Sequence, residues 1–107
     1  MDAGMRELPV GDPDGMRTFA LRLRNRAERI AARSSRVGHR VDRMRFEGPA
    51  AASFRQRMLT ARRSAEAAAA ELKEIANYLL TQAARLETEI DEWRRVQLEL
   101  GRRAGGQ

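Results

Sequence analysis

The middle of the chain reads Phe46-Glu47-Gly48-Pro49-Ala50-Ala51-Ala52-Ser53-Phe54, the composition of a turn that leads into a helix. Gly48 can adopt a left-handed backbone conformation that most residues avoid, and Pro49 suits the first turn of a helix. Phe46 places an aromatic ring just before the reversal, where it can insert between two helices and fix their angle. We therefore predict a turn at residues 46–49, with Phe46, Gly48 and Pro49 as its motif.

The residues before this turn have the spacing of one long amphipathic helix. Asp12-Pro13-Asp14 supplies a capping side chain, a proline for the first helical position and an acid at the positive end of the helix dipole. Apolar residues then recur at alternating intervals of three and four, the pattern of a heptad seam. The seam comprises Met16, Ala20, Leu23, Ala27, Ile30, Ser34, Val37, Val41 and Met44, with Ser34 as its polar member. We expect this helix over residues 13–45.

A second helix is predicted after the turn, over residues 50–100, with Gly101 ending it. Its stripe comprises Ala51, Phe54, Met58, Ala61, Ala65, Ala68, Leu72, Ile75 and Leu79, and then Ala83, Leu86, Ile90, Trp93, Gln97 and Leu100. The two successive steps of four between these groups are a stutter in the heptad pattern. Residues 1–12 and 101–107 are expected to be flexible ends.

Two helices joined by a short turn make an all-α antiparallel hairpin. At 1.5 Å per residue the first helix would be about 45 Å long and the second about 75 Å, so the end of the second would lack a partner within the hairpin. Such a hairpin buries little apolar surface, and we expect it to dimerise into a four-helix bundle. The predicted bundle interface comprises Leu23, Ile30, Val37, Val41, Phe54, Met58, Leu72, Ile75 and Leu79, and the candidates for docking a further partner are Leu86, Ile90 and Trp93.

Composition argues against several classes of function. The chain has no cysteine and a single histidine, His39, so it has no thiolate nucleophile, disulfide or cysteine zinc site. We expect no enzyme activity, no catalytic residue, no metal and no cofactor. The longest uncharged run, residues 75–84, has ten residues, half of what a membrane span needs. Residues 1–7 lack the pattern of a secretory signal, so we expect a soluble chain and any export to proceed without a leader.

The charges are unevenly distributed along the chain. The net charge is +6, from 21 basic and 15 acidic residues, and residues 16–45 contain ten arginines against Glu28 and Asp42. Residues 66–92 are acidic, with seven carboxylates against Lys73 and Arg85. The arginines favour an alternative function, that of a basic helical nucleic-acid-binding or nucleoid-associated protein. They are equally typical of a solvated face in a protein from a GC-rich coding sequence, and we favour that interpretation.

The central turn, between long amphipathic helices in a chain of 107 residues, resembles the WXG family (Trp-x-Gly, early-secreted-antigen-like proteins) of bacterial type VII, or ESX, secretion systems. The resemblance covers residues 12 to about 100. Phe46 stands where the family usually has Trp, which retains the aromatic ring and removes the indole donor. The similar elements are Asp12-Pro13-Asp14 leading into Leu21-Arg22-Leu23, the Phe46-Glu47-Gly48 turn, and Ala50, Ala51 and Phe54.

The resemblance implies a non-catalytic hairpin that pairs with itself or with a related helical hairpin, is cytoplasmic before export and is secreted without a cleaved signal peptide. Its further partners would be the type VII machinery or a larger secreted substrate. The family commonly carries an export element, Tyr-x-x-x-Asp/Glu, after the second helix. Here Tyr78 is followed four residues later by Gln82, and Trp93 by Gln97. We therefore expect either a secreted substrate or the partner or escort of a substrate that carries the element.

Overall fold

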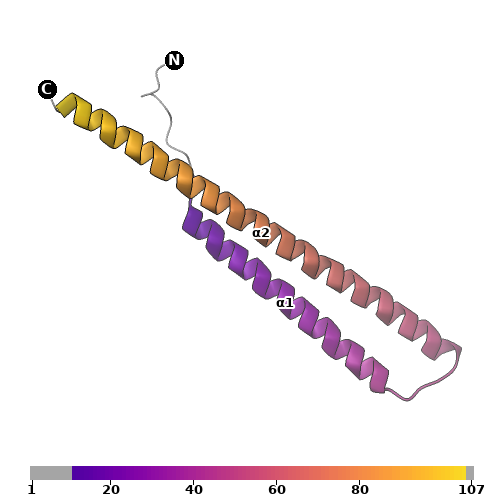
Figure 1. Cartoon of the computed structure of the whole chain (residues 1–107). Helices are drawn as coiled ribbons and strands as arrows, with labels where there is room; N and C mark the ends of the chain where they lie inside the picture. The colour runs from indigo at the N-terminus through magenta and orange to yellow at the C-terminus, as the bar shows by residue number, and fades with distance from the viewer. Residues whose placement is uncertain (1–10, 106–107) are drawn as a thin grey trace.

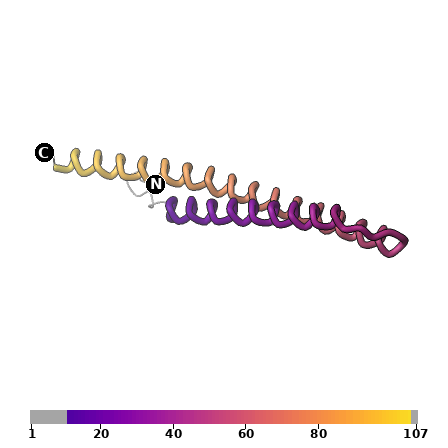
Figure 2. The backbone as a smooth tube through the Cα atoms, turned by 90° about the horizontal axis from the view of Figure 1, so that it is seen from below, coloured from indigo at the N-terminus to yellow at the C-terminus, as the bar shows by residue number. Residues whose placement is uncertain are grey.

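The computed structural model describes residues 11–105, which form two helices joined by a short connection (Figure 1). Helix α1 spans Pro13–Arg43 and helix α2 spans Pro49–Gly105. The helices lie side by side and run in opposite directions (Figures 1 and 2). The predicted all-α helical hairpin is thus confirmed. Its dimerisation into a four-helix bundle stays a prediction.

The hairpin is a rod. Its extents are 89 × 23 × 12 Å and its radius of gyration is 25.0 Å, against about 13 Å for a globular domain of roughly this length. The C-terminal part of α2 continues past the beginning of α1 (Figure 2), as the unequal helix lengths lead one to expect. Among residues 11–105, a long stretch of α2 therefore has no neighbouring helix.

The two ends of α1 lie close to their predicted positions but differ in detail. Asp12 precedes the helix and its carbonyl oxygen accepts a hydrogen bond from the Met16 amide at 3.0 Å, but its side chain makes no capping hydrogen bond. The predicted side-chain cap is therefore wrong. The Asp12 carboxylate instead lies over Gly15, where an added Cβ would be 2.5 Å from Asp12 Oδ2. At the other end α1 stops at Arg43, and the Met44 amide donates to the Val41 carbonyl oxygen at 3.1 Å.

One end of α2 lies where it was predicted, and the other does not. The start agrees, because Gly48 has a φ of +102° and its carbonyl oxygen accepts a hydrogen bond from the Ala52 amide at 3.1 Å. The end does not, because the helix continues through Gly101 to Gly105. A glycine inside a helix costs about 1 kcal/mol relative to alanine, which weakens a helix without ending it. Glu99 and Arg103 form an ion pair of 3.0 Å across Gly101, at the favourable spacing of four residues. Residues 1–10 and 106–107, which belong to the predicted flexible ends, lie outside the described residues.

Alanine forms the interface between the helices. Ala20, Ala27, Ala76 and Ala83 have no exposed surface. Residues seven apart return to the same side of a helix, so each helix presents a column of small side chains to the other. The columns are Ala20, Ala27, Ser34 and Val41 on α1, and Ala69, Ala76 and Ala83 on α2. Among the described residues, no large side chain is fully buried.

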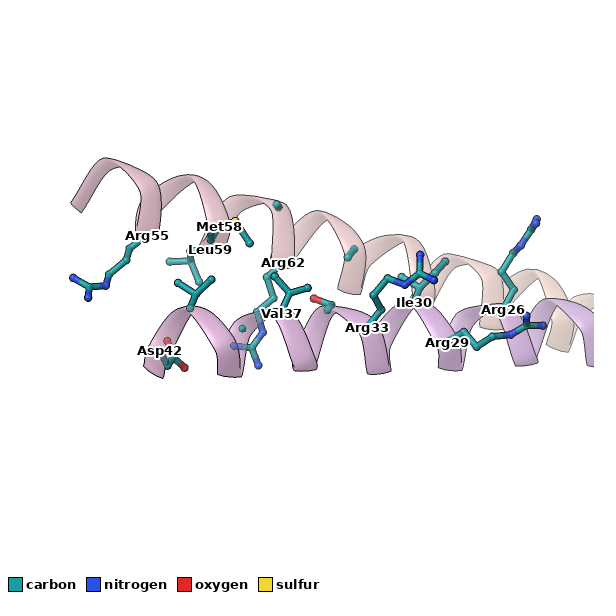
Figure 3. Close-up of a pocket in the computed structure, with 15 residues that line it drawn as sticks. Arg26, Arg29, Ile30, Arg33, Val37, Asp42, Arg55, Met58, Leu59 and Arg62 are labelled. Atoms are coloured by element: carbon teal, nitrogen blue, oxygen red, sulfur yellow. The ribbon is translucent and has the colours of Figure 1, made fainter. Parts of the chain in front are cut away.

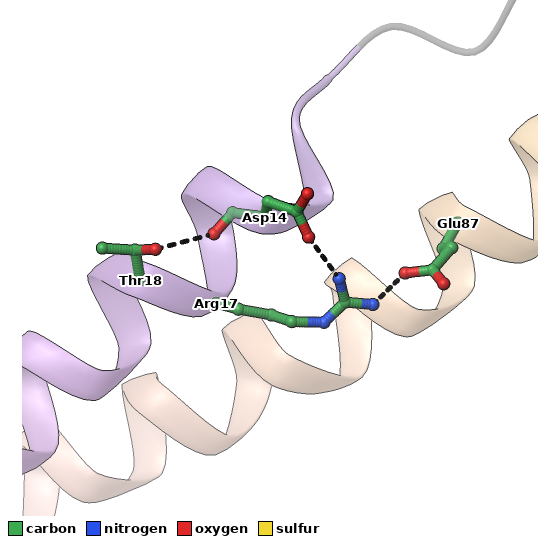
Figure 4. A network of polar contacts seen from close by, with 4 residues as sticks. All are labelled: Asp14, Arg17, Thr18 and Glu87. Atoms are coloured by element: carbon green, nitrogen blue, oxygen red, sulfur yellow. Dashed lines mark hydrogen bonds and ion pairs between the residues drawn. The ribbon is translucent and has the colours of Figure 1, made fainter.

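Two polar contacts across the interface show its register. Arg17 donates a hydrogen bond to Glu87, with which it forms an ion pair (Figure 4), and Arg24 Nη2 lies 2.5 Å from Asn77 Oδ1. The hydrogen bond that Arg17 donates to Glu87 is the main cause that raises the pKa of Arg17 above its ordinary value. In an antiparallel pair this register brings Ala27 level with Ala76 and Ala20 level with Ala83. Small residues at each level permit a short distance between the helix axes.

The predicted stutter in the second helix is wrong. The interface residues of α2 are Ala65, Ala69, Leu72, Ala76, Leu79, Ala83 and Leu86, which alternate by three and four without interruption. The prediction placed Ala68 and Ile75 on this stripe, and both are exposed in the structure. Close packing against α1 selects the smaller Ala69 and Ala76 for the interface, and Ile75 turns outward.

Replacing Ala76 by Leu is expected to destabilise the hairpin by about 1–3 kcal/mol, because a larger side chain forces the helices apart. Ala67 is exposed on the same helix, and Ala67→Leu is expected to change the free energy of unfolding by less than about 0.5 kcal/mol. Urea denaturation followed by circular dichroism, at one protein concentration, measures both. Equal stabilities of the two variants would contradict the alanine interface.

Two glycine replacements are expected to act in opposite directions. Gly48→Ala puts a Cβ on a backbone with φ of +102° and should cost about 1–3 kcal/mol. Gly101→Ala removes a glycine from within a helix and should stabilise by up to about 1 kcal/mol. Thermal denaturation of the two variants checks both signs. A loss of stability in Gly101→Ala would indicate that the helix does not continue through residue 101.

Candidate interaction surface

The two long edges of the hairpin differ in chemistry. Residues three positions after the column residues are large and apolar on both helices. Those four positions after them are mixed, namely Arg24, Ala31, Gly38 and Arg45 on α1 and Lys73, Leu80 and Glu87 on α2. When two right-handed helices pack antiparallel, residues that follow a column residue by the same number of positions lie along the same edge on both helices. The contacts of Arg17 with Glu87 and of Arg24 with Asn77 lie along the second of these edges, which we call the polar edge. The apolar edge comprises Leu23, Ile30, Val37 and Met44 of α1, Leu72, Leu79 and Leu86 of α2, and the adjoining α2 column Phe54, Ala61, Ala68 and Ile75.

The apolar edge is only partly covered within the hairpin. Val37, Phe54 and Ile75 are 38%, 40% and 45% exposed. A row of exposed apolar residues on one side of a monomer is typical of a protein interaction site, whereas isolated ones are ordinary. Of the residues predicted for the bundle interface, Val41 is buried between α1 and α2, Val37, Phe54 and Ile75 are exposed, and the half-buried ones are Leu23, Ile30, Met58, Leu72 and Leu79.

A groove of about 530 Å³ opens between the helices toward the turn (Figure 3). Ile30 and Val37 point from α1 toward α2, and Arg62 reaches from α2 toward α1 (Figure 3). The lining is apolar in the middle and rich in arginine around it. It comprises Arg26, Arg29, Ile30, Arg33, Ser34, Val37, Gly38, Val41 and Asp42 of α1, and Arg55, Met58, Leu59, Ala61, Arg62 and Ala65 of α2.

The groove begins where the alanine columns end. Beyond Ser34 and Ala69, the next residues of the two columns are Val41 and Arg62. These are larger than alanine, and helix separation follows the size of the side chains at the contact. Gly38 leaves space for Arg62, because a Cβ at residue 38 would lie 3.0 Å from Arg62 Nη1. The sequence did not reveal this groove, since its two walls come from distant segments whose register the heptad spacing alone does not determine.

The ring of Phe46 packs on the first turns of α2. Its centroid lies 5.6 Å from that of Phe54, edge to face at an interplanar angle of 65°. The guanidinium carbon of Arg55 lies 4.6 Å from the Phe46 centroid, and Arg55 Nη2 donates to the Phe46 carbonyl oxygen at 3.1 Å. The predicted wedge between the helices is thus corrected to a clasp between the connection and α2, completed by Pro49 at the helix start. The sequence reasoning anticipated an aromatic role for Phe46 but neither of its partners, Phe54 and Arg55.

The three candidates for docking a further partner lie near the point where α1 begins. Leu86, Ile90 and Trp93 are half-buried. Leu86 lies against Gly11, where an added Cβ would be 2.5 Å from Leu86 Cδ2 and the backbone has a φ of +146°. Farther along α2, Leu98 is 64% exposed. This part of α2 therefore carries half-buried apolar residues near the start of α1 and an exposed leucine beyond it.

Residues 11–105 contain no cluster of three His, Asp or Glu side chains placed to hold a metal ion. Neither α1 nor α2 is long and apolar enough to cross a membrane. Comparisons with protein-family models, with curated proteins and with solved structures find no match to this chain. The surfaces of the hairpin are therefore the basis for an inference about function.

Removing the Phe46 ring is expected to loosen the connection. Phe46→Ala loses an edge-to-face contact and a cation–π contact, which together should cost about 1–2 kcal/mol. Glu47→Ala, at an exposed neighbouring position, is the control and should be close to neutral. Thermal denaturation compares the two variants, and a Phe46→Ala protein as stable as Glu47→Ala would show that the clasp contributes nothing.

Proposed function

We propose that this chain is a non-catalytic WXG-like protein of a bacterial type VII (ESX) secretion system. It acts as a secreted substrate, or as the partner or escort of one, by pairing its apolar edge with another helical hairpin. The observation that carries the proposal is the exposed apolar edge of a hairpin whose own interface is built from alanine. The Phe46-Glu47-Gly48 turn between two long helices supports the WXG-like part of it.

The energetics favour pairing. Burying one CH₂ group contributes about 0.8 kcal/mol, and a whole Val, Leu, Ile or Phe side chain about 1.5–3 kcal/mol. The hairpin hides the methyl groups of its alanines and leaves Val37, Phe54 and Ile75 partly in water. A second hairpin on the apolar edge would bury these larger side chains, which is where most of the available hydrophobic stabilisation lies.

The second candidate function is nucleic-acid binding. It is favoured by the five arginines around the groove, Arg26, Arg29, Arg33, Arg55 and Arg62, with Asp42 as the acidic residue of the lining. Guanidinium groups bind phosphate well. The middle of the groove is apolar, however, and suits the apolar face of a helix better than a sugar-phosphate backbone. We therefore place pairing between hairpins first.

Purification of the tagged chain from its own cells, with no added partner, tests the proposed function. The native mass, the absorbance ratio and the protein composition of the complex are measured on one sample. A complex of about two chains of 12 kDa, alone or with another small helical protein, supports pairing, and co-purifying type VII components support the secretion role. A monomer would contradict pairing, and nuclease-sensitive material absorbing at 260 nm would favour the second candidate.

A charge on the apolar edge is expected to prevent pairing without unfolding the hairpin. Ile75 is 45% exposed, so Ile75→Glu should retain the helical content of the chain while placing a carboxylate where the second hairpin packs. Burying an unpaired charge costs several kcal/mol, so the dissociation constant should rise by about 100-fold or more. Lys73→Glu changes an exposed residue on the polar edge and should leave the mass unchanged. Sedimentation velocity measures both, and a paired Ile75→Glu protein would exclude this edge.

A further inference from the structure

The groove near the turn has walls of unequal length. Its lining runs over residues 26–42 of α1, about 24 Å at 1.5 Å per residue, but over residues 55–65 of α2, about 15 Å. Gly38 lies beside Arg62, where an added Cβ would be 3.0 Å from Arg62 Nη1. In an antiparallel pair the α2 lining therefore ends level with about residue 35 of α1. The groove thus has a two-walled section toward the turn and a further section lined by α1 alone.

The two sections differ in chemistry. The two-walled section is apolar in its middle, where Val37 and Met58 line it. The section lined by α1 alone carries Arg26, Arg29 and Arg33 (Figure 3). None of the ion pairs between described side chains includes any of these three arginines. Their charges are therefore available to an anion that enters the groove.

The charged side chains nearer the turn are less available to an anion. Arg62 Nε lies 3.3 Å from Glu66 Oε1. Arg55 donates a hydrogen bond to the Phe46 carbonyl oxygen and lies over the Phe46 ring. Asp42 adds a carboxylate at this end (Figure 3). The groove is therefore cationic at the end away from the turn and apolar between its two walls.

The groove is narrow. Dividing its volume of about 530 Å³ by a length of about 15–24 Å gives a mean cross-section of about 22–35 Å², a circle about 5–7 Å across. A helix with its side chains is about 10–12 Å across, so it can rest on this groove without entering it. One methylene chain, whose carbons pack about 3.5–4.0 Å from their neighbours, fits inside. The two-walled length is about half of the roughly 30 Å hydrocarbon core of a bilayer, the depth that one acyl chain spans.

We propose that the groove is a binding site for one long-chain fatty-acid anion. The acyl chain lies in the two-walled section against Val37 and Met58, and the carboxylate lies among Arg26, Arg29 and Arg33. Guanidinium groups bind carboxylates through paired, charge-assisted hydrogen bonds, which suits this head group. A lipid with two acyl chains would exceed the width of the groove. This site is separate from the proposed pairing and does not depend on it.

Isothermal titration calorimetry of the whole chain with sodium dodecanoate, below its micellar concentration, tests the class of ligand. We expect saturable binding of one dodecanoate per chain. Decanoate, which has two fewer methylene groups, should bind about tenfold more weakly. Dodecyl maltoside has the same chain length and an uncharged head group, and it should bind about tenfold more weakly or less.

Three results of this titration would overturn the proposal. Dodecanoate binding that does not saturate would show that there is no defined site. Equal affinities for dodecanoate and dodecyl maltoside would exclude recognition of an anion. Tighter binding of dodecyl phosphate than of dodecanoate would exclude a carboxylate as the preferred head group.

Two double variants of α1 test where the head group binds. Arg29→Gln/Arg33→Gln removes two charges from the groove and should weaken dodecanoate binding by about tenfold or more. Arg36→Gln/Arg40→Gln removes two exposed arginines of the same helix that lie outside the lining. This matched control should bind within about twofold of the original chain, because distant exposed charges are screened by salt. Equal losses in the two variants would show general attraction to a basic chain and overturn the site.

Filling the groove tests where the acyl chain binds. Ala61 lines the groove, so Ala61→Trp should occupy the space of the chain and weaken dodecanoate binding by about tenfold or more. Ala67 is exposed on the same helix and lies outside the lining, so Ala67→Trp should bind as the original chain does. Circular dichroism checks that both variants keep their helical content. Unchanged binding by Ala61→Trp would place the ligand elsewhere and overturn the site.

The outcomes separate this site from the proposed function. Ile75 lies outside the lining of the groove, so Ile75→Glu should bind dodecanoate unchanged even though it is expected to prevent pairing. A monomeric chain that binds dodecanoate would support the site and contradict the pairing. A paired chain that does not bind dodecanoate would overturn the site and leave the proposed function standing.

Discussion

Alanine at residues 20, 27, 76 and 83 keeps the two helices close together, and the positions of the larger side chains follow from it. Because the central columns hold only small residues, the leucines and isoleucines at neighbouring heptad positions stay at the edges of the interface or outside it. One edge joins the helices through Arg17 with Glu87 and Arg24 with Asn77. These contacts are exposed and add little stability, but they make that edge polar. The other edge carries Val37, Phe54 and Ile75 partly exposed, where a partner can reach them.

The sequence predicts the architecture well because its signals are local. Pro13 and Pro49 begin the helices, Gly48 adopts a positive φ, and the heptad spacing marks both helices as amphipathic. The face that α2 turns to α1 is not predictable in the same way, since Ala76 and Ile75 both continue an apolar stripe and the choice between them depends on how closely α1 approaches. The end at Gly101 was wrong because one glycine lowers the stability of a helix without ending it. The groove depends on the register between Arg62 and Gly38, which spacing within each helix leaves undetermined.

The distribution of charge gives the rod two different ends. The end near the turn carries arginines of both helices around an apolar groove, whereas residues 77–105 of α2 carry five acidic residues and five arginines. The exposed apolar edge that runs between these two ends suits the proposed binding of another helical rod. This binding surface is the physical basis of the proposed role in secretion. In the proposed pairing, the partner would add stability to this hairpin by burying apolar side chains that α1 and α2 leave exposed.

Amide hydrogen exchange at two protein concentrations tests the account most directly. Helix α1 begins at Pro13, near the level of residue 90 of α2, so that in the described part of the chain no helix packs beside residues 91–105. At a concentration where sedimentation shows a monomer, the amides of residues 91–105 should exchange quickly while those of residues 65–86 remain protected by α1. At a concentration where the dimer forms, residues 91–105 should become protected as well. The same exchange pattern at both concentrations, with the dimer present in one of them, would contradict the account.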